Sequence, residues 1–112
     1  MQKNLFTKER RTMITKEAAL EAIKDVMHPA INFSLLDLGI VKHVSTDEDI
    51  VYVTFAFPFP NIPIADTLIK SISEPLEKMG ATVRVDMVLM TEAEKQRFLE
   101  MEHQAWKGLE EE

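Results

Sequence analysis

Hydrophobic residues recur at helical spacing near the start of the chain, with charged residues between them. The apolar positions are Ala19, Leu20, Ile23, Val26 and Met27. This spacing predicts an amphipathic helix from Thr15 to Met27, with Thr15 as its N-cap. Pro29 restricts the residue before it, so we expect His28 in an extended or turn conformation within a connecting loop.

Two β-prone stretches follow, at Leu38 to Val44 and Ile50 to Phe57. The polar segment 45–49 between them predicts a turn, so the two strands should form a hairpin. In the second strand both faces are apolar apart from Thr54 and the Tyr52 hydroxyl. That pattern predicts a strand covered on both sides, by helices or by a partner.

A second helical stripe follows Pro63, a residue favoured at the first helical position, and ends at Gly80. Pro75 lies inside this stripe, so we expect a kink or a restart near Ser73. The predicted buried positions are Ala65, Leu68, Ile69, Ile72, Leu76 and Met79.

The last third of the chain predicts a strand and a helix. Residues 82–89 alternate, with one apolar face formed by Val83, Val85, Met87 and Leu89. The segment from Thr91 to Glu94 matches a capping box, which opens a helix over 91–109. The apolar stripe of this helix is Phe98, Met101, Ala105 and Leu109, flanked by Leu99 and Trp106.

The order of elements is therefore helix, strand, strand, helix, strand, helix, an α/β (α+β) arrangement. A strand–helix–strand unit crosses over right-handed, so the second and third strands should run parallel while the hairpin is antiparallel. We expect a small mixed three-stranded sheet. Because no charge or proline interrupts 50–57, this strand should be central, covered, or paired in a homodimer.

Composition favours one domain of ordinary globular type, with 46% hydrophobic and 29% charged residues in 112. We expect a basic tail at 1–14, the domain at 15–109 and an acidic tail at 110–112. A net charge of −6 argues against nucleic-acid binding. No apolar run reaches the roughly 20 residues of a membrane span and no secretory signal is recognisable, so a cytoplasmic location is expected.

Candidate chemistry is sparse. The chain has no cysteine, which excludes thiol catalysis and Cys-ligated metal or cluster sites made by this chain alone. Its three histidines, His28, His43 and His103, lack the short spacing of a local metal pair. No activated nucleophile and no glycine-rich phosphate loop is present, so we expect no enzyme, no metal site and no cofactor.

Two features stand out as candidate sites. Asp37 lies between leucines just before Gly39, where it suits either a turn that uses local N–H groups or a ligand contact. The turn from Phe57 to Pro63 leads into a helix, whose first N–H groups are unpaired and attract anions. Its residues are mostly apolar, and Asn61 is its only amide.

Two motifs, Leu36-Asp37-Leu38-Gly39-Ile40-Val41 and Pro60-Asn61-Ile62-Pro63, together with the order of elements, resemble the PaaD-like iron–sulfur cluster assembly domain family. The resemblance covers roughly residues 15 to 90. In that family the corresponding segments typically are Asp-Pro-Glu-Ile in the loop after the first helix, Asp-Leu-Gly-Leu-Val, and Pro-Gly-Cys-Pro. This chain resembles the stand-alone form, with an added C-terminal helix.

The resemblance implies which positions form the family site. Asp37, Gly39, Pro29, Pro60 and Pro63 fit the pattern. His28 stands where the family has Asp, Ala30 where it has Glu, Asn61 where it has Gly, and Ile62 where it has the reactive Cys. Isoleucine cannot form a thiolate or coordinate iron, so the fold is expected to be retained without the family's thiol chemistry.

Three functions remain open from the sequence. The first is a noncatalytic accessory or adaptor protein of iron–sulfur cluster assembly, with protein partners bound through Phe57, Phe59 and Ile62 near Asp37; any cluster would need partner thiolates. The second is a small-molecule or anion-binding domain, with a pocket between that turn and the last helix. The third is an enzyme in which Asp37 and His28 act as acid and base, which requires the two side chains to lie close together.

Overall fold

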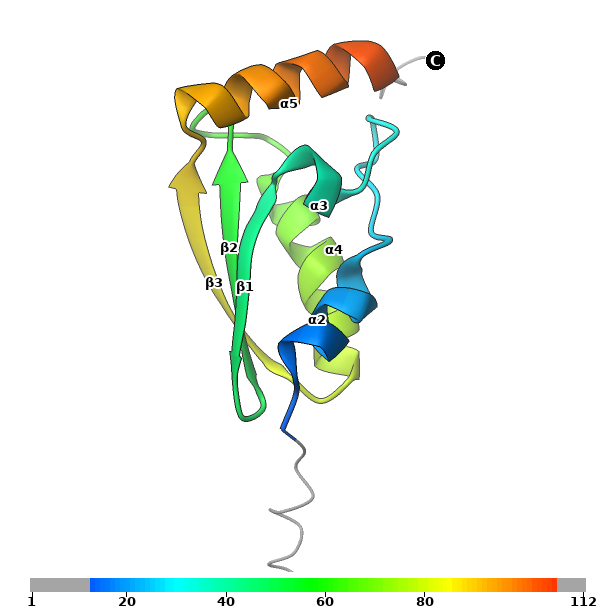
Figure 1. The fold of residues 1–112 in the computed structure, drawn as a ribbon, viewed down its shortest axis with the longest axis vertical. Helices are drawn as coiled ribbons and strands as arrows, with labels where there is room; N and C mark the ends of the chain where they lie inside the picture. Colours follow the sequence, from blue (N-terminus) through cyan, green and yellow to red (C-terminus); the bar gives the residue numbers. More distant parts are fainter. Residues whose placement is uncertain (1–12, 107–112) are drawn as a thin grey trace, which may run out of the picture.

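A computed structural model, which describes residues 13–106, shows helices packed against a mixed three-stranded sheet (Figure 1). The strands are β1 (Val41–Asp47), β2 (Ile50–Phe57) and β3 (Thr82–Leu89). The helices are α2 (Lys16–Ile23), α3 (Leu35–Leu38), α4 (Ala65–Lys78) and α5 (Glu92–Ala105). The predicted α+β class is confirmed, with one additional short helix, α3.

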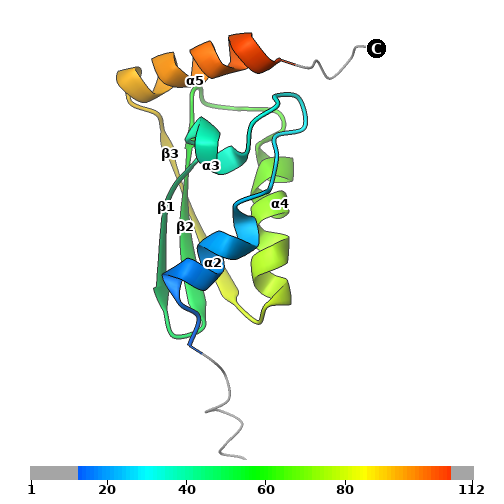
Figure 2. The same ribbon diagram turned by 45° about the vertical axis from the view of Figure 1, so that its right-hand side comes forward.

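The sheet has the order β1-β2-β3, in which β1 pairs antiparallel and β3 parallel with β2. Both predicted orientations are confirmed, and β2 is the central strand. Figures 1 and 2 show α2 and α4 on one face of the sheet and α5 across the end where β2 and β3 terminate. Tyr52 on the other face is 42% exposed, so of the two predicted covers for β2, helices or a partner, cover of both faces by helices is wrong for the described residues.

The core lies between the sheet and these helices. Every second residue of β2 points into it, and apolar stripes of α2 and α4 meet them, so strand and helix periodicities converge on one layer. The largest fully buried side chains are Phe55, Ile23, Ile31, Leu35, Leu38, Ile40, Leu68, Ile72, Leu76, Val51 and Val53.

The first helix is shorter than the sequence suggests. Thr15 is its N-cap as predicted, since its hydroxyl accepts a hydrogen bond from the Ala18 N–H at 3.0 Å. The helix ends at Ile23 rather than Met27 because the following backbone pairs elsewhere: Leu35 N–H donates to the Val26 carbonyl at 2.9 Å. Before the helix, Ile14 of the predicted tail is buried and donates its N–H to the Glu48 carbonyl at 2.9 Å.

The hairpin is shifted relative to the prediction. The strand expected from Leu38 begins at Val41, because the preceding residues form α3, with Ser34 as N-cap and Gly39 in the left-handed conformation (φ 83°) as its end. The strand also continues to Asp47, so the predicted polar turn shrinks to its last residues, with Glu48 at φ 56°. Ser34 and Gly39 are residue types that favour the start and the end of a helix, respectively, so both ends of α3 are capped.

In α4, Ile64 is the N-cap, so Pro63 lies before the helix rather than at its first position. The helix continues through Pro75, so of the predicted kink or restart near Ser73 the restart is wrong, and the kink stays a prediction. Leu68, Ile72 and Leu76 are buried as expected, whereas Met79 is exposed. Gly80 ends this helix segment with φ 97°, as predicted from its position.

The capping box at the start of α5 is confirmed, since Thr91 and Glu94 exchange hydrogen bonds between side chain and backbone. The helix ends at Ala105 and Trp106 is extended, so the predicted continuation of the helix is wrong at Trp106. Its remaining part, 107–109, lies outside the described residues, as do most of the N-terminal tail and the acidic tail. No helix within residues 13–106 is long and apolar enough to cross a bilayer.

Candidate functional site

The turn between β2 and α4 is held by backbone contacts at both ends. Met90 N–H donates to the Phe57 carbonyl at 2.8 Å, and Ala65 N–H donates to the Ile62 carbonyl at 3.1 Å. Between them Asn61 has φ 58°, a left-handed conformation that asparagine tolerates better than most residues. Asn61, which stands where the family has glycine, therefore has the backbone conformation that favours glycine.

The apolar side chains of this turn differ in exposure. Phe57 is buried and Ile62 is half-buried, whereas Phe59 is 45% exposed. The ammonium of Lys95 on α5 lies 5.2 Å from the centre of the Phe59 ring, within cation–π range. The turn thus presents one large aromatic surface to solvent beside a basic residue.

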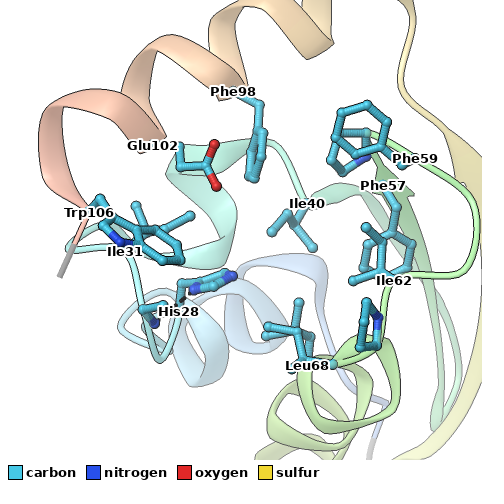
Figure 3. Close-up of a pocket in the computed structure, with 14 residues that line it drawn as sticks. His28, Ile31, Ile40, Phe57, Phe59, Ile62, Leu68, Phe98, Glu102 and Trp106 are labelled. Carbon is cyan, nitrogen blue, oxygen red and sulfur yellow. Dashed lines mark hydrogen bonds between the residues drawn. The ribbon is translucent and has the colours of Figure 1, made fainter. Parts of the chain in front are cut away.

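A cavity of about 280 Å³ lies between this turn, the loop after α2, and α5 (Figure 3). It is the pocket that the sequence predicted between Phe57, Phe59, Ile62 and the last helix. Apolar side chains dominate its wall, and among residues 13–106 the ionisable ones that line it are His28 and Glu102. The lining residues are His28, Ala30, Ile31, Ile40, Phe57, Pro58, Phe59, Ile62, Pro63, Ile64, Leu68, Phe98, Glu102 and Trp106.

His28 lies in the loop after α2, as predicted, and its side chain is buried. Its Nδ1 accepts a hydrogen bond from the Ala30 N–H at 2.9 Å, so in the neutral imidazole the proton resides on Nε2. Figure 3 shows its ring directed into the cavity. His28 therefore helps to shape the pocket wall and to fix the conformation of its own loop.

The sequence placed Asp37 among apolar residues at the start of a strand, but its position in the structure is different. It lies in α3 and is exposed. Its backbone N–H donates to Ser34 Oγ at 3.0 Å, and its carbonyl accepts from Arg97 Nη1 at 2.9 Å. Asp37 is not among the residues that line the cavity with His28. The structure therefore does not place these two side chains in one pocket.

A second concavity, of about 340 Å³, lies on the β3 side of the same turn. Its wall combines the turn residues with the end of β3, including Met87 and Leu89. Sequence reasoning did not assign these two residues to the site, nor Glu102 and Trp106 to the first cavity. The sequence did indicate these two residues, because Met87 and Leu89 belong to the apolar face of a strand that can lie at the exposed edge of a small sheet.

No group of three or more His, Cys, Asp or Glu side chains within residues 13–106 is arranged to hold a metal ion. The full chain also contains no cysteine. The side chains of the turn do not fit a cluster-binding site, because thiolates are the usual ligands of iron–sulfur clusters. This chain supplies no thiolate ligand for a cluster.

The family model described as iron-sulfur cluster assembly protein matches residues 16–89. The chain belongs to this family. The matched span includes the loop of His28, the α3 segment with Asp37, and the turn with Ile62, so the predicted PaaD-like membership is confirmed. Membership supports involvement in iron–sulfur cluster assembly. A comparison with curated proteins found no match.

Helix α5 lies beyond the matched residues, yet it closes one side of the cavity. Phe98, Glu102 and Trp106 all come from this helix or its end. Two backbone contacts fasten that end to the loop after α2: Asn32 N–H donates to the Ala105 carbonyl at 3.0 Å, and Ile31 forms a bridge with Trp106. In this member of the iron–sulfur cluster assembly family, one wall of the cavity beside the turn is thus formed by an element outside the family match.

Proposed function

We propose that this protein is a noncatalytic accessory or adaptor in iron–sulfur cluster assembly or delivery, and that it binds protein partners through the turn 57–63. The observation that carries the proposal is the half-buried Ile62 at the position of the family's reactive cysteine, beside the exposed ring of Phe59. A site without a thiolate retains its shape and its apolar contact surface. Shape and apolar surface are what a protein contact requires.

Asp37 is proposed as a second contact. Its side chain is exposed, while both of its hydrogen bonds described above are made by its backbone. A partner can therefore engage the carboxylate without disturbing α3. The separate surroundings of Asp37 and His28 support the noncatalytic assignment, because acid–base catalysis needs both groups within reach of one substrate.

Ile62→Asp tests the adaptor role, with Ile69→Asp as the matched control. Ile62 and Ile69 are both half-buried, but Ile69 lies in the body of α4. Bound proteins would be identified after affinity capture with each variant, and thermal unfolding would be recorded in parallel. Cysteine-bearing cluster-assembly proteins should be captured by the wild type and by Ile69→Asp, and lost with Ile62→Asp. Equal capture by a folded Ile62→Asp variant contradicts the proposal.

Anaerobic reconstitution with iron and sulfide separates an adaptor from a cluster carrier. The wild-type chain is expected to acquire no sulfide-to-iron absorbance, whereas Ile62→Cys restores the ligand that the family uses at this position. A cluster in the Cys variant alone indicates an inherited site that has lost its ligand. A cluster in the wild type refutes the noncarrier assignment.

A small-molecule-binding role is the second candidate, because the predicted cavity is present and its wall is almost wholly apolar. Such a wall suits an apolar ligand. An anion at the start of α4 is less favoured, since Asp66 already places a negative charge in the first turn.

The fluorescent probe 1-anilinonaphthalene-8-sulfonate tests whether the cavity accepts an apolar ligand. Ala30→Leu would reduce the cavity, and Ala22→Leu on α2 is the control, because Ala22 does not line it. Fluorescence enhancement should fall with Ala30→Leu and persist with Ala22→Leu. Equal enhancement by both variants, or none by the wild type, argues against a binding cavity.

A further inference from the structure

Strand β3 is an edge strand whose outer side is unpaired within residues 13–106. Edge strands are usually protected by charged side chains, above all lysine, by proline, by bulges or by short length. This strand is eight residues long, contains no proline and pairs with β2 in regular register throughout. It therefore offers a regular template for another strand.

The side chains of β3 are unusually apolar for an exposed edge. On the face shared with the helices, Val85 is 41% exposed, Met87 58% and Leu89 56%. The register places them beside Val53, Phe55 and Phe57 of β2, whose side chains are buried. The apolar layer of the core thus continues outward into solvent along this strand.

The opposite face of β3 carries one positive and one negative side chain, Arg84 and Asp86. They are the only charged residues of the strand, and they flank Val85 symmetrically. We propose that two copies of this chain associate through β3, paired antiparallel about a two-fold axis at Val85. This joins the two sheets into one continuous sheet.

The charges select this register over its neighbours. In a two-fold antiparallel pair centred on Val85, Arg84 lies opposite Asp86 of the second copy, and Asp86 lies opposite Arg84. A pair centred on Arg84 places two arginines face to face, and one centred on Asp86 places two aspartates face to face. Opposite charges stabilise directly opposed cross-strand positions and like charges destabilise them.

The apolar face is also complementary in this register. Val85 meets its own counterpart, and Met87 meets Val83 of the second copy. These side chains lose the exposure that they have in the single chain, as expected for the centre of an interface between identical subunits. The contact borders the concavity formed by Met87 and Leu89 with the turn, but it does not depend on the proposed function of that turn.

The other edge of the sheet explains why association would stop at two copies. Strand β1 carries Lys42, His43 and Asp47, and its pairing with β2 is irregular between Val41 and His43. Charges and a bulge disfavour further strand addition. An interface of the two-fold kind with a protected outer edge closes as a dimer.

Charge reversal tests the register with the full chain. By sedimentation velocity over a concentration series, the wild type should show a monomer–dimer equilibrium, and Arg84→Asp or Asp86→Arg alone should weaken dimerisation by about tenfold or more. Lys70→Glu on α4 makes the same charge change as Arg84→Asp away from β3 and should leave the equilibrium unchanged. An equimolar mixture of the two single variants should recover dimers, because each then meets the opposite charge.

Cysteine cross-linking tests the axis independently, since the chain has no native cysteine. Val85→Cys places two thiols opposite each other, with Cα atoms roughly 4.5–5.5 Å apart, a separation that a disulfide can span. Met87→Cys is the control on the same face, because its two copies would be separated by roughly 13 Å along the strands. Rapid oxidation to a covalent dimer is expected for Val85→Cys only.

Three results would overturn the proposal. The first is a wild type that remains monomeric throughout the concentration series. The second is a mixture of Arg84→Asp and Asp86→Arg that remains monomeric although circular dichroism shows that both variants are folded. The third is faster cross-linking of Met87→Cys than of Val85→Cys. The last result would show that the strands associate in another register.

Discussion

Arg97 donates a hydrogen bond from its Nη1 to the backbone carbonyl of Asp37 at 2.9 Å, which fastens α5 to the end of α3. The two residues are far apart in the sequence. The contact attaches the helix outside the family match to the segment that carries the family's Asp-Leu-Gly motif. It uses the Asp37 main chain, so it is independent of the carboxylate.

Arg97→Ala and Asp37→Asn should therefore have different effects. Losing the Arg97 hydrogen bond should lower the free energy of unfolding by about 1 kcal/mol, because the orphaned carbonyl lies at an exposed place. Asp37→Asn keeps the main-chain contact and should leave stability nearly unchanged. Urea unfolding of both variants measures the difference. An Asp37→Asn variant that is as unstable as Arg97→Ala contradicts the assignment of Asp37 to the surface.

Phe57 and Phe59 should separate stability from surface function. Phe57 is 6% exposed, and Phe57→Ala should lower the free energy of unfolding by about 3–5 kcal/mol through loss of buried contacts and a new cavity. Phe59→Ala loses an exposed ring and its contact with Lys95, which together contribute about 1 kcal/mol. Chemical denaturation of the two variants makes the comparison. Similar losses would show that Phe59 is part of the core.

The main features of the fold were predictable because long periodic segments dominate it. The three strands, their orientations and the helices α4 and α5 follow from alternation, stripes and a capping box. Helix α3 was missed because its four residues are too few to show a helical period. Its signals were local ones, Ser34 as cap and Gly39 as terminator, and they compete with the β-prone stretch from Leu38 to Val44, which overlaps the end of the helix.

The site was predictable in part. The turn residues Phe57, Phe59 and Ile62 do line the expected cavity, because they lie close together in one short turn that leads into a helix. The opposite wall depends on where the end of α5 docks, through Asn32 and Ala105. That contact joins distant segments, so no local pattern indicates it. Asp37 was placed in the wrong surroundings for the same reason that α3 was missed.

Gly39→Ala should destabilise the protein through backbone strain. Gly39 has φ 83°, and an added Cβ would meet only Arg97 Nη1, at 4.0 Å, which is an ordinary contact. The cost therefore comes from the left-handed conformation, at about 1–2 kcal/mol. Asn61→Ala, which also replaces a residue of positive φ but in the turn, is a useful comparison. A neutral Gly39→Ala variant in urea unfolding would show that this helix end relaxes to another conformation.

Glu94 should make the attachment of α5 sensitive to acid. A hydrogen bond from the Thr91 backbone N–H, and next the Lys42 ammonium, hold the pKa of this carboxyl below its ordinary value of 4.5. Lys42 Nζ lies 3.1 Å from its Oε2. Because the pKa is lower in the folded state than in the unfolded state, the carboxylate stabilises the fold above pH 4.5, and this contribution disappears as the pH falls through the lowered value.

Glu94→Gln keeps an oxygen acceptor for the Thr91 N–H but removes the charge, so it should be less stable than the wild type at neutral pH. The difference should shrink as the pH falls below 4.5, where the wild-type carboxyl becomes protonated. Thermal unfolding from pH 7 to pH 3 measures it, with Glu100→Gln as a control that removes one charge from the same helix. A difference that stays constant across this range, or that equally affects Glu100→Gln, would mean that the ion pair between Lys42 and Glu94 contributes nothing to the docking of α5 on β1.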